Sequence, residues 1–299
     1  MIRVEGVTKY FEDFKVLDGV CMNVRRGTIY GLVGPNGAGK TTLINHICGV
    51  LTPKNGTITV GGESVYENEN IKKRVLSISD DWFYYGTFTI REMAKFYRSV
   101  YPNFSMERYN AIKDVFKIDE KRQIRKLSKG MKKQVAFWLS LSAMPEVLIL
   151  DEPLDGLDPV MRKQVLSLVI ADVADRGMTV LVSSHNLREL EDICDWVGII
   201  HEGRMILERP LDDLKGNVHK YQVMLTAESA EELKQSESVL HLSHTGSVYN
   251  VILRGDAEKH DLRMQELSPN LCERVSLTLE EVFIYELGGL GYDIQNILV

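Results

Sequence analysis

The feature that most constrains the fold is a glycine-rich loop, "GPNGAGKTT" at 34–42, which directly follows the apolar segment "GTIYGLV". The loop matches the pattern G-x-x-x-x-G-K-[ST], which joins a β-strand to an α-helix and binds phosphate. Its glycines allow backbone conformations that turn successive N–H groups inward around an anion. The helix that starts near Lys40 adds the positive end of its dipole. The sequence therefore predicts a P-loop nucleotide site; a glycine-rich turn without a ligand is the alternative.

Each residue type in this loop has an expected task. Lys40 would reach the β- and γ-phosphates, and the hydroxyl of Thr41 would hold Mg²⁺. The backbone of the remaining positions would surround the phosphates. The loop residues expected to bind the nucleotide are Gly34, Pro35, Asn36, Gly37, Ala38, Gly39, Lys40, Thr41 and Thr42.

Two further segments place polar residues where buried strands end. "VLILDEP" at 147–153 carries Asp151 and Glu152, and "LVSSHN" at 181–186 carries His185. Ligands of an open parallel sheet collect at the carboxyl edge of its strands. We expect Asp151 to bind Mg²⁺, directly or through water, and Glu152 to act as general base for an attacking water. His185 would hydrogen-bond the γ-phosphate or orient that water. Acids that cap the following turn are the alternative.

Positive charge is concentrated at 121–133, although the whole chain has a formal charge of −6. Within this run Ser128 is expected to cap the start of a helix, so that the N–H groups from Lys129 onward point toward an anion. Gly130 would let that anion approach the backbone closely. A nucleotide phosphate is the expected anion; a solvated helix face and an RNA- or DNA-binding patch are the alternatives. The helix should bury one apolar face, formed by Val135, Trp138, Leu139 and Ser142 or Ala143.

The order of elements predicts the fold class. Short strands are expected at 2–7 and 15–30, separated by the aromatic-rich "KYFEDF", and residues 89–143 show helical periodicity. From residue 146 onward, apolar strands alternate with helices, which indicates a parallel sheet covered on both faces. "HEGR" at 201–204 predicts a tight hairpin turn.

Two domains are expected. Residues 1–214 should form an α/β P-loop NTPase domain: a RecA-like parallel sheet with N-terminal antiparallel β-structure and a helical subdomain at about 89–143. Composition changes near 215–220. Residues 215–299 should form a small α+β domain whose element order resembles a split βαβ unit. The join is expected near 213–219.

Composition argues against several other classes of protein. Acidic residues outnumber basic ones by 42 to 36, whereas a general nucleic-acid binder is usually basic. The four cysteines lie far apart, which suits a reducing cytosol rather than a disulfide framework or a zinc site. No signal peptide is visible, and no apolar stretch approaches the ~20 residues that cross a bilayer. We therefore expect the protein to be cytoplasmic, and any role at a membrane would require a partner that holds it there.

These motifs, in this order, resemble the ATP-binding subunit of ABC transporters over about residues 2–213. The glycine-rich loop is similar to Walker A and "VLILDEP" to Walker B. "LSKGM" at 127–131 is similar to the signature loop, and "DGLD" at 155–158 to the D-loop. His185 stands in the place of the switch histidine. The resemblance implies ATP as the nucleotide and Mg²⁺ as its metal.

The resemblance also implies a nucleotide-sandwich dimer, formed by two identical chains or by a paralogous pair. Ser128, Lys129 and Gly130 of one subunit would then face the ATP held by the other, with Asp158 of the D-loop close by. Phe11 falls where the family stacks adenine on an aromatic ring, and the preceding tyrosine is the fallback.

Several positions depart from the family pattern, among them Met131 and Gln134, which replace the common Gln and Arg of the signature loop. Lys129 occupies the place of the first glycine of the signature loop, although its backbone N–H is retained. The family's Q-loop glutamine should follow a strand near 74–79, where this chain has Asp80, or Asp81 if the register slips by one. A carboxylate binds Mg²⁺ by charge and donates no hydrogen bond unless it is protonated. Asp80 is therefore an expected metal ligand, but the glutamine's role in sensing the partner is not carried over.

The implied function is that of an ATPase subunit. ATP-driven dimer closure and Mg²⁺-dependent hydrolysis would power a separate transmembrane permease, which would hold this chain at the inner face of the cell membrane. The tail "LTLEEVFIYELGG" at 277–289 resembles the branch that exports drugs, antibiotics and peptides, with a simple packing helix as the alternative. The aromatic stretch "DDWFYYGTF" at 80–88 falls where the family meets the coupling helix of the permease, with core packing as the alternative.

A soluble ABC ATPase that acts on ribosomes or nucleic acid is the competing function, motivated by the cationic run. Translation factors of that kind usually carry two nucleotide domains, and the repair and chromosome ATPases carry long coiled coils. This chain has one Walker A loop and no long heptad tract. A P-loop kinase is a third class, but it would not need the signature loop or the D-loop. No nucleic-acid partner is therefore expected.

Overall fold

The computed structural model describes residues 1–79, 82–236, 238–267 and 271–288. The chain divides into two compact units. The first comprises Met1–His185 with Ile193–Glu208, and the second comprises Asn186–Asp192 with Arg209–Val299. This division lies slightly before the expected join near 213–219, and the domain limits of 1–214 and 215–299 stay a prediction.

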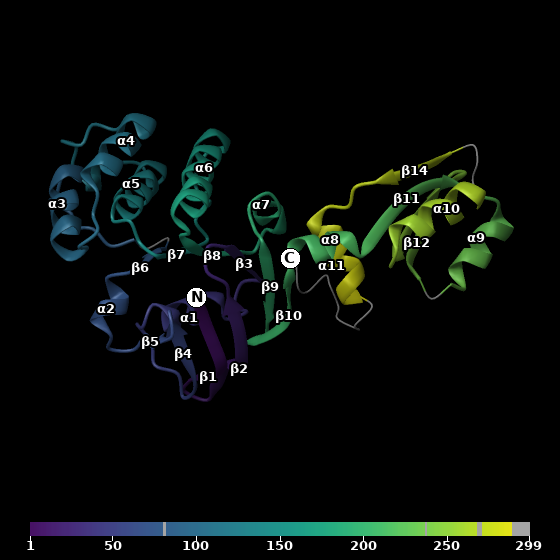
Figure 1. The fold of residues 1–299 in the computed structure, drawn as a ribbon, viewed down its shortest axis with the longest axis horizontal. Coiled ribbons are helices and arrows are strands. Elements are labelled where there is room, and N and C mark those ends of the chain that lie inside the picture. The colour runs from purple at the N-terminus through teal and green to yellow at the C-terminus, as the bar shows by residue number, and fades with distance from the viewer. Residues whose placement is uncertain (80–81, 237, 268–270, 289–299) are drawn as a thin grey trace. The chain divides into compact units, whose positions relative to one another are not determined.

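A six-stranded sheet forms the centre of the first unit (Figure 1). The pairs β3–β8, β3–β9, β7–β8 and β6–β7 are parallel, as the strand–helix alternation predicted. Every residue of β3, β7 and β8 is buried, which explains why these strands read as continuous apolar runs. The strands lie in the order β10 (Arg204–Pro210), β9 (Trp196–His201), β3 (Ile29–Val33), β8 (Thr179–Ser184), β7 (Val147–Asp151) and β6 (Val75–Ile78).

The turn between β9 and β10 is the tight hairpin expected at 201–204. β9 ends at His201 and β10 begins at Arg204. The two residues between them, Glu202 and Gly203, both have positive φ, of 46° and 74°. Two successive positive φ values match a two-residue turn whose twist suits a β-hairpin.

A second, antiparallel sheet lies at the N-terminus, in the order β2 (Phe14–Val24), β1 (Ile2–Phe11), β4 (Asn55–Val60) and β5 (Glu63–Ser64). The expected break at "KYFEDF" is wrong. β1 and β2 continue until Phe11 pairs with Phe14, because the chain needs only the two residues between them to turn. The expected strand at 15–30 is instead divided into β2 and β3 by residues 25–28.

Helix α1 (Lys40–Ile47) shares a buried core with both sheets. Ile2 of β1, Leu43 of α1 and Ile149 of β7 belong to one cluster of fully buried side chains. The helix therefore holds the end of the glycine-rich loop in a fixed position against the central sheet. Helix α6 (Pro159–Arg176) follows β7 and starts at an Asp158 cap with proline in its first turn.

The predicted helical region contains α3 (Ile90–Val100), α4 (Met106–Phe116), a 3₁₀ turn at Ile124–Lys126 and α5 (Lys129–Ser142), and the short α2 (Glu69–Lys72) precedes it. Trp138 of α5 is fully buried, stacks on Tyr109 at 4.7 Å between ring centroids, and donates its indole N–H to the Tyr109 carbonyl at 2.7 Å. The apolar face expected for α5 is buried throughout.

The second unit contains an antiparallel sheet in the order β12 (Val239–Thr245), β13 (Val248–Arg254), β11 (Val218–Met224) and β14 (Cys272–Val275). With α9 (Ala227–Lys234) and α10 (Ala257–Leu267) it has the β-α-β-β-α-β order of a split βαβ fold, as predicted. Its own core contains Tyr221, Val251 and Met264. The unit also includes α7 (Leu187–Glu191), α8 (Leu211–Gly216) and α11 (Leu279–Gly288). Within the described residues, no helix combines the length and apolar character that crossing a membrane requires.

Candidate functional site

The glycine-rich loop connects β3 to α1, and its backbone needs glycine at specific positions. Gly37 and Gly39 have φ values of 83° and 105°, in the region that side chains disfavour. A Cβ atom at Gly34 would lie 2.2 Å from the carbonyl oxygen of Ile200 in β9. Gly39 is also the N-cap of α1, so the loop ends at the positive end of a helix dipole. The backbone therefore has the form of an anion-binding loop.

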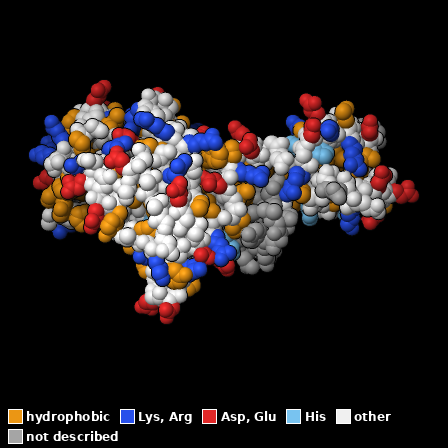
Figure 2. All heavy atoms as spheres, turned by 60° about the horizontal axis from the view of Figure 1, so that its bottom comes forward, with side chains coloured by type: hydrophobic (Ala, Val, Ile, Leu, Met, Phe, Trp, Pro, Cys, Tyr) orange, Lys and Arg blue, Asp and Glu red, His pale blue; other side chains and the backbone are white. Residues whose placement is uncertain are grey.

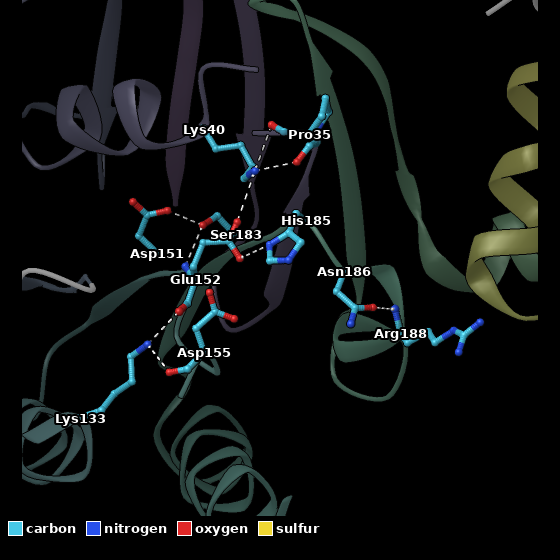
Figure 3. A network of polar contacts seen from close by, with 11 residues as sticks. Pro35, Lys40, Lys133, Asp151, Glu152, Asp155, Ser183, His185, Asn186 and Arg188 are labelled. Atoms are coloured by element: carbon cyan, nitrogen blue, oxygen red, sulfur yellow. Dashed lines mark hydrogen bonds and ion pairs between the residues drawn. The ribbon is translucent and has the colours of Figure 1, made fainter. Parts of the chain in front are cut away.

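Lys40 is the central cation of the site. Only 6% of the residue is exposed, and its ammonium donates to the carbonyls of Gly34 at 2.6 Å and Pro35 at 3.2 Å. The same nitrogen lies 3.3 Å from Oε1 of Glu152. Figure 3 shows the lysine directed toward Glu152 and the loop. The cation is thus held by its own loop and by the carboxylate expected to be the base.

Glu152 stands between this lysine and the expected histidine. Its Oε2 lies 2.9 Å from Nδ1 of His185 (Figure 3). The glutamate side chain is 21% exposed, while that of the histidine is 47% exposed. Because β3, β8 and β7 are neighbours, their carboxyl ends bring all three side chains to one edge of the sheet. The sequence-based expectation that Lys40, Glu152 and His185 lie together is therefore met by the geometry.

The backbone around the acid pair is held by a serine that the sequence analysis did not select. Ser183, the penultimate residue of β8, donates its hydroxyl to Asp151 Oδ1 at 2.5 Å and accepts the backbone N–H of Glu152 at 3.1 Å. Asp151 is 7% exposed. Glu152 itself has a φ of 46°, which is rare for a residue with a side chain and is typical of strained functional positions. A serine near the end of the strand that leads to His185 was the available signal.

A cavity of about 750 Å³ opens beside these residues. Thr41, Asp151 and Glu152 line it, together with Cys48 and Ser77. A hydroxyl and a carboxylate are the hard oxygen donors that Mg²⁺ prefers, and Mg²⁺ normally keeps several water ligands. Thr41 and Asp151 therefore fit a magnesium ion bound to a phosphate. The described residues contain no group of three or more His, Cys, Asp and Glu that could hold a metal ion.

The expected ligand Asp80 lies outside the described residues, as does Asp81. Ser79, which precedes them, lines the same cavity. The assignment of Asp80 to the metal stays a prediction.

The signature-like loop begins α5 as expected. Ser128 caps the helix by accepting the N–H of Met131 at 3.3 Å. Gly130 packs closely on the segment that follows Glu152, since a Cβ atom at this position would lie 3.1 Å from the carbonyl oxygen of Gly156. Ser128 and Lys129 are exposed, so the dipole end of α5 is accessible. One interpretation is corrected: within residues 121–133, Lys133 is buried and faces the protein interior rather than an external anion.

The remaining expected residues are more loosely connected to the site. Asp158 caps α6 by accepting the N–H groups of Val160 and Met161, both at 3.0 Å. Phe11 ends β1 in the antiparallel sheet and is 47% exposed, with the ammonium of Lys9 5.4 Å from its ring centroid. An exposed ring is available for stacking. The structure describes no contact between these two residues and Lys40 or Glu152.

The other loop positions act through their backbone. Asn36 and Gly37 are exposed at the tip of the loop, whereas Ala38 is buried. The N–H of Ala38 donates to the Pro35 carbonyl at 3.2 Å and closes the turn. The carbonyl of Thr42 interacts with Nδ1 of His46 at 2.7 Å within α1. These contacts stabilise the loop and the first turns of α1 that follow it.

Lys133 is the second residue that the sequence analysis did not select. Its ammonium donates to the backbone carbonyls of Glu152 at 3.0 Å and Asp155 at 2.9 Å (Figure 3). The sequence signal was weak, because Lys133 is one of seven cations in the run and nothing in the sequence distinguishes it from the neighbouring Lys132.

Comparison with known proteins identifies the family. Residues 17–155 match the protein family described as "ABC transporter". The chain is 30% identical over 289 residues to the ABC transporter ATP-binding protein YtrB of Bacillus subtilis (strain 168), covering 97% of this chain and 99% of the relative. It is 37% identical over 227 residues to the bacitracin transport ATP-binding protein BcrA of Bacillus licheniformis, covering 74% and 73% of the two chains.

The fold gives the same answer. A solved structure described as the ATP-binding subunit of an ABC transporter superposes with a TM-score of 0.68 and 29% sequence identity, covering 72% of this chain and 92% of that one. The motifs, the fold and the relatives of this chain agree: it is a nucleotide-binding ATPase subunit and belongs to the ATP-binding proteins of ABC transporters.

Proposed function

We propose that this subunit hydrolyses Mg²⁺-bound ATP with Glu152 as the general base, and that hydrolysis drives a separate membrane permease. The observation that carries the proposal is the position of Glu152, 3.3 Å from the Lys40 ammonium and 2.9 Å from the His185 ring. One carboxylate oxygen therefore faces the phosphate-binding cation, and the other faces a group that can orient it. This is the arrangement a base needs to act on water at a γ-phosphate.

Nucleotide binding would rearrange the contacts of Lys40. Its ammonium is now satisfied by two loop carbonyls and by Glu152. Phosphate oxygens entering the loop are stronger acceptors than neutral carbonyls, so they would draw the ammonium toward the nucleotide. Glu152 would then be released to accept a proton from the attacking water. The N–H groups at the start of α1 would add hydrogen bonds to the phosphates.

His185 would orient the base and contact the γ-phosphate. Its Nδ1 interacts with Glu152, while nearly half of its side chain is exposed and open to a ligand. Thr41 and Asp151 would hold Mg²⁺, which supplies charge neutralisation between the β- and γ-phosphates when it is bound. Ser183 would hold the Asp151 carboxylate and the Glu152 backbone in fixed positions relative to each other.

The complete site would require a second subunit. Ser128, Lys129 and Gly130 stand at the positive end of a 14-residue helix, two of them exposed, where they could bind the phosphates of ATP held by a partner. Lys129 would add a charge where the family usually has glycine. Asp158 would lie at the dimer interface and Phe11 would stack on adenine. Two identical chains or a paralogous pair would satisfy this geometry.

The permease is proposed to dock beside the large cavity of the first unit. Phe83 and Tyr85 from the aromatic stretch are exposed by 65% and 40%, and Phe83 lines the cavity with Phe96 of α3. Figure 2 shows hydrophobic side chains beside Lys and Arg at the end of this unit that carries α3 and α4. Exposed aromatic clusters mark protein interaction sites. Binding there would place this chain on the cytoplasmic face of the membrane.

Export of a drug, antibiotic or peptide is the proposed direction and cargo class. One support is the similarity of the chain to BcrA, a bacitracin transport ATP-binding protein. The other is the resemblance of residues 277–289 to the C-terminal extension of the export branch. The cargo would be selected by the permease. Reconstitution with that permease tests the class: ATP-dependent accumulation of nutrients instead of expulsion of such compounds would overturn it.

The test of the proposed function is Glu152→Gln. Turnover should fall on the order of 10²-fold or more, since an amide cannot accept the proton of water. ATP binding should persist, and the stalled protein should form a dimer that mass measurement detects only with Mg-ATP present. The matched control is Glu5→Gln, which replaces a carboxylate that is 60% exposed on β1. Unchanged turnover in Glu152→Gln would remove the assigned base.

A further inference from the structure

A buried lysine joins two parts of the first unit that the sequence places far apart. Lys133 lies in the first half of α5, is 6% exposed, and donates to the carbonyls of Glu152 and Asp155. An ammonium in the interior is costly to desolvate, so a buried lysine is retained where its hydrogen bonds compensate. Both of these carbonyls lie just after β7, and one of them belongs to Glu152 itself.

The backbone that receives these bonds is strained. Glu152 has a φ of 46°, in the left-handed region that a residue with a Cβ atom rarely occupies and only at a cost in free energy. Such a conformation persists only when surrounding contacts determine it. Ser183 holds the N–H side of Glu152, and Lys133 holds its C=O side. The peptide units on both sides of the proposed base are therefore bound to side chains.

The same face of α5 carries the close approach of the signature-like loop. Gly130 lies three residues before Lys133, so the two share one face of the helix. A Cβ atom at Gly130 would come within 3.1 Å of the Gly156 carbonyl. The first turns of α5 are thus packed and hydrogen-bonded onto residues 152–156, which run from the end of Walker B into the D-loop.

We propose that Lys133 is a positioning residue for hydrolysis: its ammonium sets the backbone conformation that aims the Glu152 carboxylate, and ties that conformation to the helix that begins at Ser128. The inference rests on the proposed role of Glu152 as the base. Movement of the start of α5, the part proposed to contact the partner's nucleotide, would be passed to the base of its own subunit through this ammonium. Each subunit would then bring its base into position when its own α5 meets the partner's ATP.

The decisive variant is Lys133→Met, which keeps the length and apolar stem of the side chain and removes its donors. Two carbonyls lose their charge-assisted bonds, and Glu152 is free to leave its strained φ. We expect kcat to fall about tenfold or more, because small misplacements of a catalytic group have effects of that size. The Kd for ATP should stay within about twofold, since the carbonyls that Lys133 binds belong to Glu152 and Asp155 and not to the glycine-rich loop.

Two further variants separate positioning from general stability. Lys133→Arg retains donors and charge, so it should recover part of the lost kcat. Lys95→Met, an exposed lysine on α3, should leave kcat and Kd as in the wild type. A loss of kcat in Lys133→Met that is matched by an equal loss of ATP binding would contradict positioning and indicate local unfolding.

The strongest test combines Lys133→Met with Glu152→Gln and measures residual single turnover. If Lys133 acts through Glu152, its loss should have no further effect once the base is absent. An additional tenfold loss in the double variant would show that Lys133 acts elsewhere and would overturn the inference. The outcomes are distinguishable: full activity of Glu152→Gln removes the proposed base, whereas full activity of Lys133→Met removes only the positioning role.

Discussion

At the scale of single residues, one missing Cβ atom in β9 leaves room for the side chain of Tyr30 from β3. Gly198 pairs with Leu32 across the two parallel strands. A Cβ atom at Gly198 would lie 2.0 Å from the hydroxyl of Tyr30 and 2.7 Å from the methyl group of Met205. Tyr30 is fully buried, so its ring has little room to move. This glycine is required by packing, not by its φ.

Gly198→Ala is therefore expected to destabilise the first unit by about 1–3 kcal/mol, the usual effect of overpacking a core. Urea unfolding followed by tryptophan fluorescence measures it. Tyr30→Phe removes the clashing oxygen, so adding it to Gly198→Ala should restore part of the loss. An equal loss in the presence and absence of Tyr30→Phe would contradict this account.

At the scale of elements, one carboxylate holds the helical region together. Glu120 accepts hydrogen bonds from Arg91 of α3, from Lys113 of α4 at 3.0 Å, and from the hydroxyl of Tyr109 at 3.0 Å. The backbone N–H of Arg91 also donates to the Glu120 carbonyl at 3.0 Å. The guanidinium of Arg91 above all, with Lys113 and Tyr109, lowers the pKa of Glu120 from its ordinary value near 4.5 to about 2.

This pKa predicts a pH dependence of stability. A carboxylate with a lowered pKa stabilises the fold above its unfolded pKa and loses that contribution as the pH falls toward the folded value. Between about pH 5 and pH 3, the free energy of unfolding should fall more steeply in the wild type than in Glu120→Gln. The difference in slope stays below about 1.4 kcal/mol per pH unit, because one carboxyl group exchanges at most one proton. Urea titrations at several pH values measure both slopes, and identical slopes would contradict the assigned network.

At the scale of the whole molecule, the described residues include a hydrophobic core within each of the two units. One includes Leu181 of β8 and joins both sheets of the first unit with α1. The other includes Leu253 of β13 and joins the sheet of the second unit with α9 and α10. Both leucines are almost fully buried. Separate cores of this kind can unfold in separate transitions.

Matched variants test this independence. Leu181→Ala and Leu253→Ala should each cost about 2–5 kcal/mol, but in different transitions of a calorimetric scan. ATP with Mg²⁺ should raise only the transition that Leu181→Ala lowers, because ligand binding stabilises the unit that binds it. A single transition that both variants and ATP shift together would show one cooperative structure.

Much of the site could be predicted because its signals are local. The conformation of the glycine-rich loop follows from its own residues, since Gly37 and Gly39 have positive φ values that few other residue types adopt. The meeting of Lys40, Glu152 and His185 followed from the rule that parallel strands end at one edge. The roles of Asp80 and Phe11 stay predictions, the first because it lies outside the described residues.

Other features could not be read from the chain. The aromatic "KYFEDF" was expected to separate two strands, but pairing between Phe11 and Phe14 carries the ladder to the turn. Lys133 was counted as a surface cation, and only the packing of α5 on residues 152–156 buries it. Ser183 gains its role because β8 lies beside β7.

By itself, the sequence determined the type of loop, the order of strands and helices, and the chemistry brought to one sheet edge. Each of these depends on near neighbours in the chain, on the periodicity of apolar residues, or on the preference of glycine for positive φ. Only the tertiary structure decided which of several equal charges is buried and which carbonyls it meets. Those outcomes depend on contacts between segments about twenty or more residues apart, and local patterns do not encode such distances.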